Sequence, residues 1–189
     1  MRRNAVVAAL LAGCFSFVLA TQASAQDKSE RPAASPTPAQ IVALDECDPA
    51  TFNAAIGPDF CKNVALAALG FATTLNDLFA QAAAGTPDPG WDFEPDVVHM
   101  KKGTVLSVVD QGGEPHTFTE VAKFGGGFIE PLNSGQTMAP ECAGGFKNLA
   151  VARTRLIQGS HLDLGNLSKG THRFECCIHP WMRVRVEVK

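Results

Sequence analysis

From Trp91 onward, the sequence consists of short β-type runs separated by turns rich in Gly and Pro. The last run, residues 183–189, places Val184, Val186 and Val188 on one face, as expected for a half-buried strand. The other predicted strands are residues 97–100, 104–110, 153–158, 161–164 and 171–175. Many short strands punctuated in this way indicate a mainly β fold, either a sandwich or a barrel.

The first 25 residues have the pattern of a secretory signal peptide. A positive start at Arg2 and Arg3 is followed by an apolar run over residues 5–19. Small residues at Ala23 and Ala25 then form a cleavage site. We therefore expect export to the periplasm or otherwise out of the cytoplasm.

The alternative for this region is a bacterial lipoprotein box over residues 11–14, which would place a lipid anchor on Cys14. The chain stays apolar from Phe15 to Ala20, whereas a lipoprotein usually becomes polar after its cysteine. Soluble export is therefore favoured. No apolar run after residue 25 is long enough to span a membrane.

Residues 26–40 are polar and rich in Pro, Ala and Ser, which predicts a flexible linker. A helical extension is expected over residues 41–88, followed by a domain of residues 89–189. Within the extension, Asp48 and Pro49 indicate the start of a short helix. A second helix is expected over about residues 62–84, with an apolar face formed by Phe71, Leu75, Leu78, Phe79 and Ala82. We expect this face to pack on the following domain; binding of a partner protein is the alternative.

One short segment contains the residues with the most distinctive chemistry. Cys176, His179 and Met182 follow the pattern C-x-x-H-x-x-M before the last predicted strand, and His116 follows a turn upstream. A thiolate, two imidazoles and a thioether suit copper, because sulfur favours Cu(I), imidazole holds Cu(II) and a weak axial Met tunes the potential. We therefore expect these four residues to bind one copper ion, although each alone also fits an ordinary structural role.

Residues 91–189 resemble a cupredoxin, the blue-copper family of plastocyanin, pseudoazurin and azurin. The resemblance is carried by residues 103–105, by residues 116–118 and by the C-x-x-H-x-x-M loop. It implies a Greek-key β-sandwich, to which the N-terminal helical segment is an addition, as in exported bacterial copper proteins of this class. It also implies that the copper ligands are His116, Cys176, His179 and Met182.

The same resemblance implies that His179 lies at the exposed end of the site, where electrons enter and leave. Ile178, Pro180 and Trp181 would then form an apolar rim for the transient docking of redox partner proteins. For Trp181, a structural place without a role in electron transfer is the alternative.

Cys177 departs from the family pattern, which needs no second thiol beside the ligand. Free thiols are unusual in an oxidising compartment, so four cysteines remain to form two disulfides once Cys176 is assigned to copper. We predict the pairs Cys47–Cys61, across the short helix, and Cys142–Cys177, beside the ligand loop. In the competing interpretation Cys177 is the ligand, which the spacing of the motif disfavours.

For the other histidines and for Glu114, the sequence favours positions without a role in metal binding. His99 follows a predicted strand and is expected at the surface. His161 and His172 flank predicted strands and are expected to face solvent or to bond to the backbone, with a weak accessory metal site as the alternative. Glu114 lies two residues before His116; it is expected in a turn, with orientation of the site as the alternative.

The composition narrows the classes of function that the chain could have. A net charge of −3 argues against nucleic-acid binding. The chain has 5 His and no H-x-H pair, too few for an additional trinuclear cluster of a multicopper oxidase, so no enzymatic activity is expected.

We expect a protein that shuttles single electrons between redox partners. The alternative is copper storage, sensing or delivery, although the chain has only 4 Met and no Met-rich tract. A third possibility is that the helical extension docks the copper domain onto a larger enzyme or membrane complex.

Overall fold

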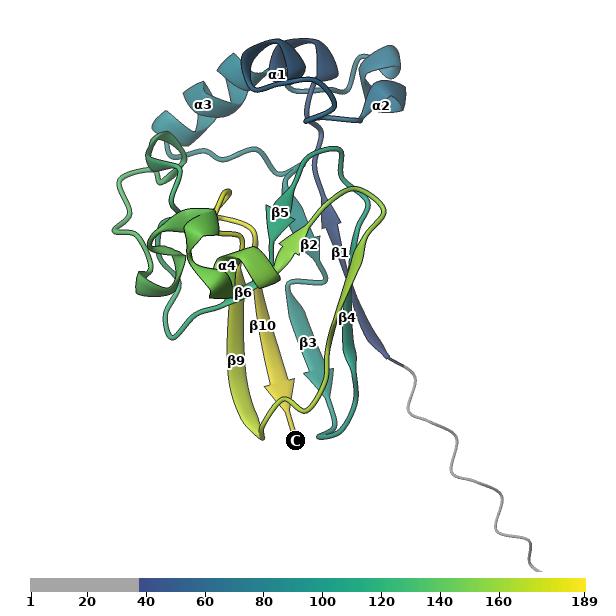
Figure 1. Ribbon diagram of the computed structural model, residues 1–189, viewed down its shortest axis with the longest axis vertical. Coiled ribbons are helices and arrows are strands. Elements are labelled where there is room, and N and C mark those ends of the chain that lie inside the picture. Colours follow the sequence, from purple (N-terminus) through teal and green to yellow (C-terminus); the bar gives the residue numbers. More distant parts are fainter. Residues whose placement is uncertain (1–37) are drawn as a thin grey trace, which may run out of the picture. The chain divides into compact units, whose positions relative to one another are not determined.

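The computed structural model describes residues 38–189 (Figure 1). The predicted signal peptide, the box around Cys14 and nearly all of the predicted linker therefore lie outside the described residues. Among the described residues, no helix is both long and apolar enough to cross a membrane.

Two four-stranded sheets form the framework. One has the order β2-β1-β4-β8 and consists of β2 (Asp92–Glu94), β1 (Ala39–Leu44), β4 (Leu106–Asp110) and β8 (His161–Leu164). The other has the order β3-β10-β9-β6 and consists of β3 (Val97–Met100), β10 (Arg183–Val188), β9 (Gly170–Glu175) and β6 (Thr119–Glu120). The pairs β1–β4 and β10–β3 are parallel, and the other pairs are antiparallel. The prediction of a mainly β sandwich with a helical segment is confirmed.

The core lies between the two sheets and is rich in aromatic rings. Phe93 of the first sheet meets Phe118 edge-on, with ring centroids 5.1 Å apart. Phe118 in turn stacks on Phe174 of the second sheet at 4.4 Å. Val184, Val186 and Val188 of β10 are buried as the alternation predicted, so their methyl groups complete this interior.

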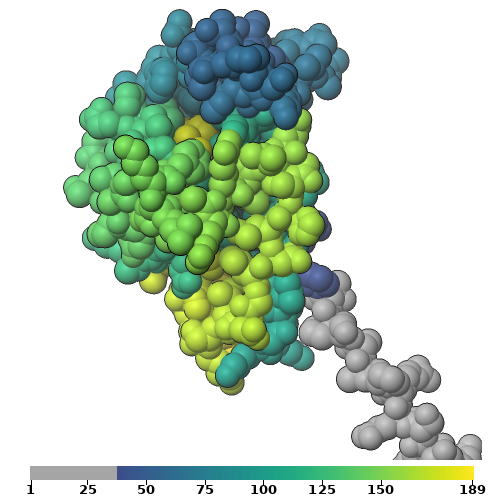
Figure 2. Space-filling model, viewed as in Figure 1, coloured from purple at the N-terminus to yellow at the C-terminus, as the bar shows by residue number. Residues whose placement is uncertain are grey.

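Three helices connect β1 to β2: α1 (Pro49–Ala55), α2 (Val64–Leu69) and α3 (Leu75–Ala83). α1 begins as predicted, because the Asp48 carboxylate accepts hydrogen bonds from the amides of Ala50 and Thr51. The helices gather at the end of the sandwich opposite the C-terminus and cover it (Figures 1 and 2).

The structure corrects two expectations for this segment. Residues 39–44, expected at the end of a linker and the start of a helical extension, form β1 and pair with β4 and β2. The helix expected over residues 62–84 is two helices, because Gly70 ends α2 in the left-handed conformation and Thr74 caps α3. Phe71 lies between them and is 65% exposed, whereas Leu78 is buried as expected.

The segment between β6 and β8 contains more helix than the sequence indicated. It forms the short helix α4 (Leu149–Arg153) and the 3-10 turns η1 (Glu130–Leu132), η2 (Pro140–Cys142) and η3 (Gly145–Lys147). The strand expected over residues 153–158 is reduced to β7 (Arg155–Leu156), which pairs with β5 (His116–Thr117). This small ribbon positions His116 at the helix-covered end of the sandwich.

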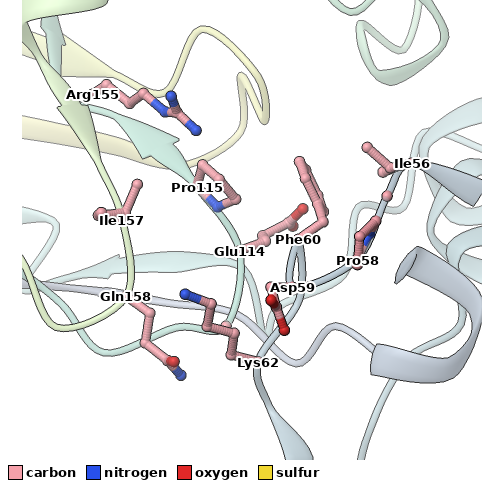
Figure 3. A pocket seen from close by; sticks show the side chains of 12 residues that line it. Ile56, Pro58, Asp59, Phe60, Lys62, Glu114, Pro115, Arg155, Ile157 and Gln158 are labelled. Atoms are coloured by element: carbon pink, nitrogen blue, oxygen red, sulfur yellow. The ribbon is translucent and has the colours of Figure 1, made fainter. Parts of the chain in front are cut away.

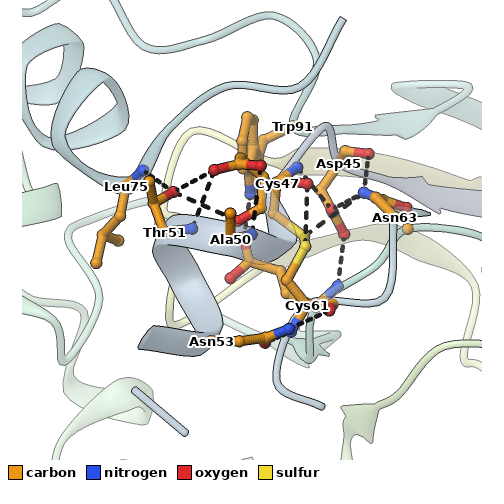
Figure 4. The surroundings of a disulfide bond; sticks show 12 residues. Asp45, Cys47, Ala50, Thr51, Asn53, Cys61, Asn63, Leu75 and Trp91 are labelled. Atoms are coloured by element: carbon orange, nitrogen blue, oxygen red, sulfur yellow. Dashed lines mark hydrogen bonds between the residues drawn. A yellow bond between two sulfur atoms is a disulfide. The ribbon is translucent and has the colours of Figure 1, made fainter. Parts of the chain in front are cut away.

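Both predicted disulfides are confirmed. Cys47–Cys61 closes the loop that contains α1 (Figure 4), and Cys142–Cys177 joins η2 to the segment that follows β9.

Candidate metal centre

The loop between β9 and β10, residues 176–182, brings most of the candidate ligands together. The amide of Cys176 donates to the carbonyl of Met182 at 3.1 Å, and the amide of Met182 donates to the carbonyl of His179 at 3.0 Å. These backbone bonds fold the loop back on itself. His116 reaches the same place from β5, about 60 residues earlier in the chain.

The sulfur of Cys176 faces both imidazoles. Its Sγ atom lies 3.9 Å from Nδ1 of His116 and 3.8 Å from Nδ1 of His179. The two rings meet edge-on, with centroids 5.4 Å apart. All three side chains are buried, and each offers a ligand atom within 4.8 Å of the others. The Met182 side chain on the same loop is fully buried.

The environment of Cys176 favours the thiolate. The amides of Thr117 and His179 both point at Sγ, each at 3.4 Å. Burial opposes ionisation of the thiol, but hydrogen bonds and charge from the two imidazoles outweigh it. The pKa of Cys176 therefore lies well below its ordinary value. A thiolate is the form that binds metals.

Each imidazole is held from behind by a buried carboxyl group. Nε2 of His116 lies 3.0 Å from Oδ2 of Asp45, and Nε2 of His179 lies 3.2 Å from Oε1 of Glu114. Because Nε2 is engaged in both rings, Nδ1 is the nitrogen that faces the sulfur.

The two carboxyl groups differ in their surroundings. Burial raises the pKa of Asp45, but the hydrogen bond and the charge of His116 outweigh it, so that pKa is lowered. For His116, burial is outweighed by the bonds to Asp45 and Cys176, and its pKa is raised well above the ordinary value. Burial raises the pKa of Glu114.

Two further residues contact the candidate ligands: Asp45, which sequence reasoning missed, and Glu114, for which it gave orientation of the site only as the alternative. Glu114 was expected in a turn; its side chain is 2% exposed and contacts His179 and Trp91, which is the placement that the alternative interpretation requires. Proximity to His116 in sequence was its only signal. Asp45 lies 71 residues from His116 and had none.

The expectation of an exposed His179 is wrong. The residue is 1% exposed, because Trp91, Trp181 and Glu114 surround its ring. Ile178 and Pro180 of the expected rim are buried as well. Trp181 is half-buried and meets the His179 ring edge-on at 5.5 Å.

The other histidines stand apart from this cluster. His99 and His161 are exposed, as predicted. His99 pairs with Glu187 at 3.1 Å, and the partly exposed His172 pairs with Glu120 at 2.6 Å.

The donor atoms gathered here fit a copper ion. Cys176 offers a sulfur, and His116 and His179 offer Nδ1 atoms that face it, whereas Met182 is a fully buried residue of the same loop. Soft sulfur combined with imidazole is a ligand set suited to both oxidation states of copper. Cys177 is occupied in its disulfide, which leaves Cys176 as the free cysteine among residues 38–189.

The similarities of this chain to known proteins are distant. No protein-family model matches the sequence, and no curated protein matches it. Among solved structures, a purple cupredoxin from Nitrosopumilus maritimus is 13% identical, with 80% of this chain and 99% of that one covered and a TM-score of 0.40. A reduced amicyanin variant is 18% identical, with coverages of 52% and 73% and a TM-score of 0.33. A Cu(I) form of another amicyanin variant is also 18% identical, with coverages of 57% and 89% and a TM-score of 0.34. At these values, the similarities say nothing about the function of this chain.

Proposed function

We propose that this chain is an exported type 1 copper protein of the cupredoxin class that shuttles single electrons between redox partners and has no enzymatic activity. The single observation that carries the proposal is the placement of the Cys176 sulfur within 4 Å of Nδ1 of both His116 and His179. Together with Met182, these residues would bind one copper ion. Copper bound there would alternate between Cu(I) and Cu(II) and so carry one electron.

The surroundings of the proposed ligands support a carrier, because a rigid site needs little rearrangement when its charge changes. The ligand loop is fixed by its own backbone hydrogen bonds and by the Cys142–Cys177 disulfide. Carboxyl groups hold the far side of each imidazole. These contacts limit the movement of the donor atoms.

The burial of the donors favours electron transfer over copper storage or delivery with the same residues. An ion that is handed to another protein needs a ligand that can be reached from outside, whereas His116, Cys176 and His179 are at most 1% exposed. Electrons can cross a covered site. Trp181 contacts the His179 ring and is partly exposed, so we infer that redox partners dock transiently beside it.

Two measurements on the mature protein loaded with one equivalent of copper distinguish these functions. An electron carrier gives a reversible one-electron wave in voltammetry and retains Cu(I) for hours against a moderate chelator. A delivery protein loses Cu(I) to the same chelator within seconds to minutes, and that result would exclude the carrier. Trp181→Ala should slow electron exchange with a redox protein without releasing copper, while Phe146→Ala, an exposed aromatic substitution elsewhere, should change neither.

A further inference from the structure

The Glu114 carboxyl group lies between two rings that are themselves buried. Its Oε1 atom accepts a hydrogen bond from the indole Nε1 of Trp91, and the same oxygen lies 3.2 Å from Nε2 of His179. An indole N–H can only donate, so Oε1 must be an acceptor. An ionised carboxylate carries no proton that it could donate to the imidazole. With Glu114 ionised, Nε2 of His179 is therefore the side of this contact that carries the ring proton.

We propose that Glu114 is a positioning residue that fixes the tautomer and the orientation of His179. With the proton held on Nε2, the lone pair of the neutral ring is on Nδ1, which faces the Cys176 sulfur at 3.8 Å. This inference rests on the proposed function, because the lone pair on Nδ1 would be the one that binds copper. It assigns to Glu114 a part in building the site without contact with the metal.

Glu114 can do this because its own position is fixed on two sides. Trp91 is buried and stacks on Phe52 of α1, with ring centroids 6.3 Å apart, so the indole cannot move away. The Glu114 amide donates to Oδ2 of Asp45 at 3.0 Å, the same oxygen that contacts Nε2 of His116. One connected network therefore orients both imidazoles.

The helix-containing segment that follows β1 supports this network. Asp45 follows β1, and Nδ2 of Asn63 donates to its Oδ1 at 2.6 Å (Figure 4). Phe52, which stacks on Trp91, comes from α1. Residues of the helix-containing segment thus hold the two carboxyl groups in place behind the ligands.

The far side of Glu114 determines which substitutions are informative. Glu114 lines a cavity of about 380 Å³ together with Phe60, Lys62 and Arg155 (Figure 3). Truncation to Ala would extend this cavity toward His179 and admit water. Leu fills similar space without an acceptor, and Gln keeps one acceptor oxygen, so Glu114→Leu and Glu114→Gln separate the polar contact with Nε2 of His179 from the packing.

The test compares these two variants with the wild type, and uses Asp88→Asn as a matched control. Asp88 is also buried, and its carbonyl accepts from the Trp91 amide, but its carboxyl group accepts hydrogen bonds from Thr73 and Gly90. Copper affinity is measured by competition with a chelator. In the diamagnetic Cu(I)-loaded protein, ¹⁵N NMR reports whether His179 carries a slowly exchanging proton on Nε2.

Glu114→Leu should weaken copper binding by about 10- to 100-fold, as removal of such supporting contacts typically does. It should also lose the slowly exchanging Nε2 proton. Glu114→Gln should keep the proton and remain within about 3-fold of the wild-type affinity, the level also expected for Asp88→Asn. If Glu114→Leu does not fold, Trp91→Phe removes the indole donor that holds Glu114 and should speed exchange of the same proton.

Unchanged affinity and an unchanged Nε2 proton in Glu114→Leu, with copper bound normally by the wild type, would overturn the role of Glu114 and leave the proposed function standing. A wild-type protein that binds no copper would instead overturn the proposed function.

Discussion

Cys176 and Cys177 are consecutive in the chain, yet their side chains belong to different hydrophobic clusters. Cys176 lies in the main core and faces His116 and His179. Cys177 lies in a second, smaller cluster and is bonded to Cys142. The backbone at this point is therefore held from both sides, which keeps the free sulfur in place.

Removal of the Cys142–Cys177 disulfide should destabilise the protein and loosen the ligand loop. The two cysteines are 35 residues apart, for which the chain-entropy relation gives a loss of about 4 kcal/mol in the free energy of unfolding. Urea denaturation of the Cys142→Ala/Cys177→Ala double variant measures this loss. The control, Cys47→Ala/Cys61→Ala, opens a loop of 14 residues and should lose about 3 kcal/mol. A copper spectrum unaltered by loss of Cys142–Cys177 would argue against the bracing role.

A methyl group at Gly127 should disturb the ligand loop directly. A Cβ built there would lie 2.1 Å from the carbonyl oxygen of Cys177, and that oxygen is backbone and cannot move aside. We expect Gly127→Ala to lose about 1–3 kcal/mol of unfolding free energy, the usual range for overpacking. Gly165→Ala is the control, since a Cβ at Gly165 meets nothing within 4 Å. Equal thermal melting of the two variants would contradict this account.

Phe118 should be the aromatic residue on which packing between the sheets depends most. It is fully buried and contacts both Phe93 and Phe174. Phe118→Ala should lower the free energy of unfolding by about 3–5 kcal/mol, measured in urea. Phe146→Ala removes a ring that is 42% exposed, and its loss should be much smaller. Similar losses in both variants would show that the core is not organised around Phe118.

His172 should titrate above the ordinary pKa of histidine. Its Nε2 donates to the carbonyl of Ser168 at 2.9 Å, and its Nδ1 lies 2.6 Å from the Glu120 carboxylate; both contacts favour the charged ring and raise its pKa. Because folding raises this pKa, the charged His172 ring contributes its full stabilisation at pH values below the pKa of the unfolded state, about 6.5. The contribution disappears as the pH rises through the pKa of the folded state.

NMR titration of His172 measures this shift. Glu120→Gln should move the pKa downward, and the stability difference between this variant and the wild type should be larger at pH 5 than at pH 9. Glu130→Gln, an exposed acidic substitution elsewhere, should leave the titration unchanged. A His172 pKa at or below the ordinary value would contradict the prediction.

Local patterns in the sequence predicted the parts of the site that are themselves local. The spacing of Cys176, His179 and Met182 placed them on one loop. Cysteine parity gave the number of disulfides, and the position of Cys47 and Cys61 on either side of the short helix gave the pairs. The alternation in residues 183–189 predicted β10. In each case the physical determinant lies within a few residues or in a simple count.

The features that sequence reasoning missed depend on contacts distant in the chain. Residues 39–44 form a short apolar run that suits a helix or a strand equally, and only pairing with β4 decides between them. Asp45 carries no local mark, and Glu114 has only its closeness to His116 in the sequence, because their contacts arise when the fold brings them behind His116 and His179. The burial of His179 likewise results from Trp91 and Trp181, which the sequence could not place around its ring.

The absorption spectrum of the purified protein with one equivalent of Cu(II) tests the central claim most directly. If Cys176, His116, His179 and Met182 bind the ion together, the wild type should show an intense visible charge-transfer band from thiolate to copper, saturating at one copper per chain. The Cys176→Ser variant should bind copper without showing that band. The absence of the band in the wild type, or its persistence in Cys176→Ser, would contradict the account.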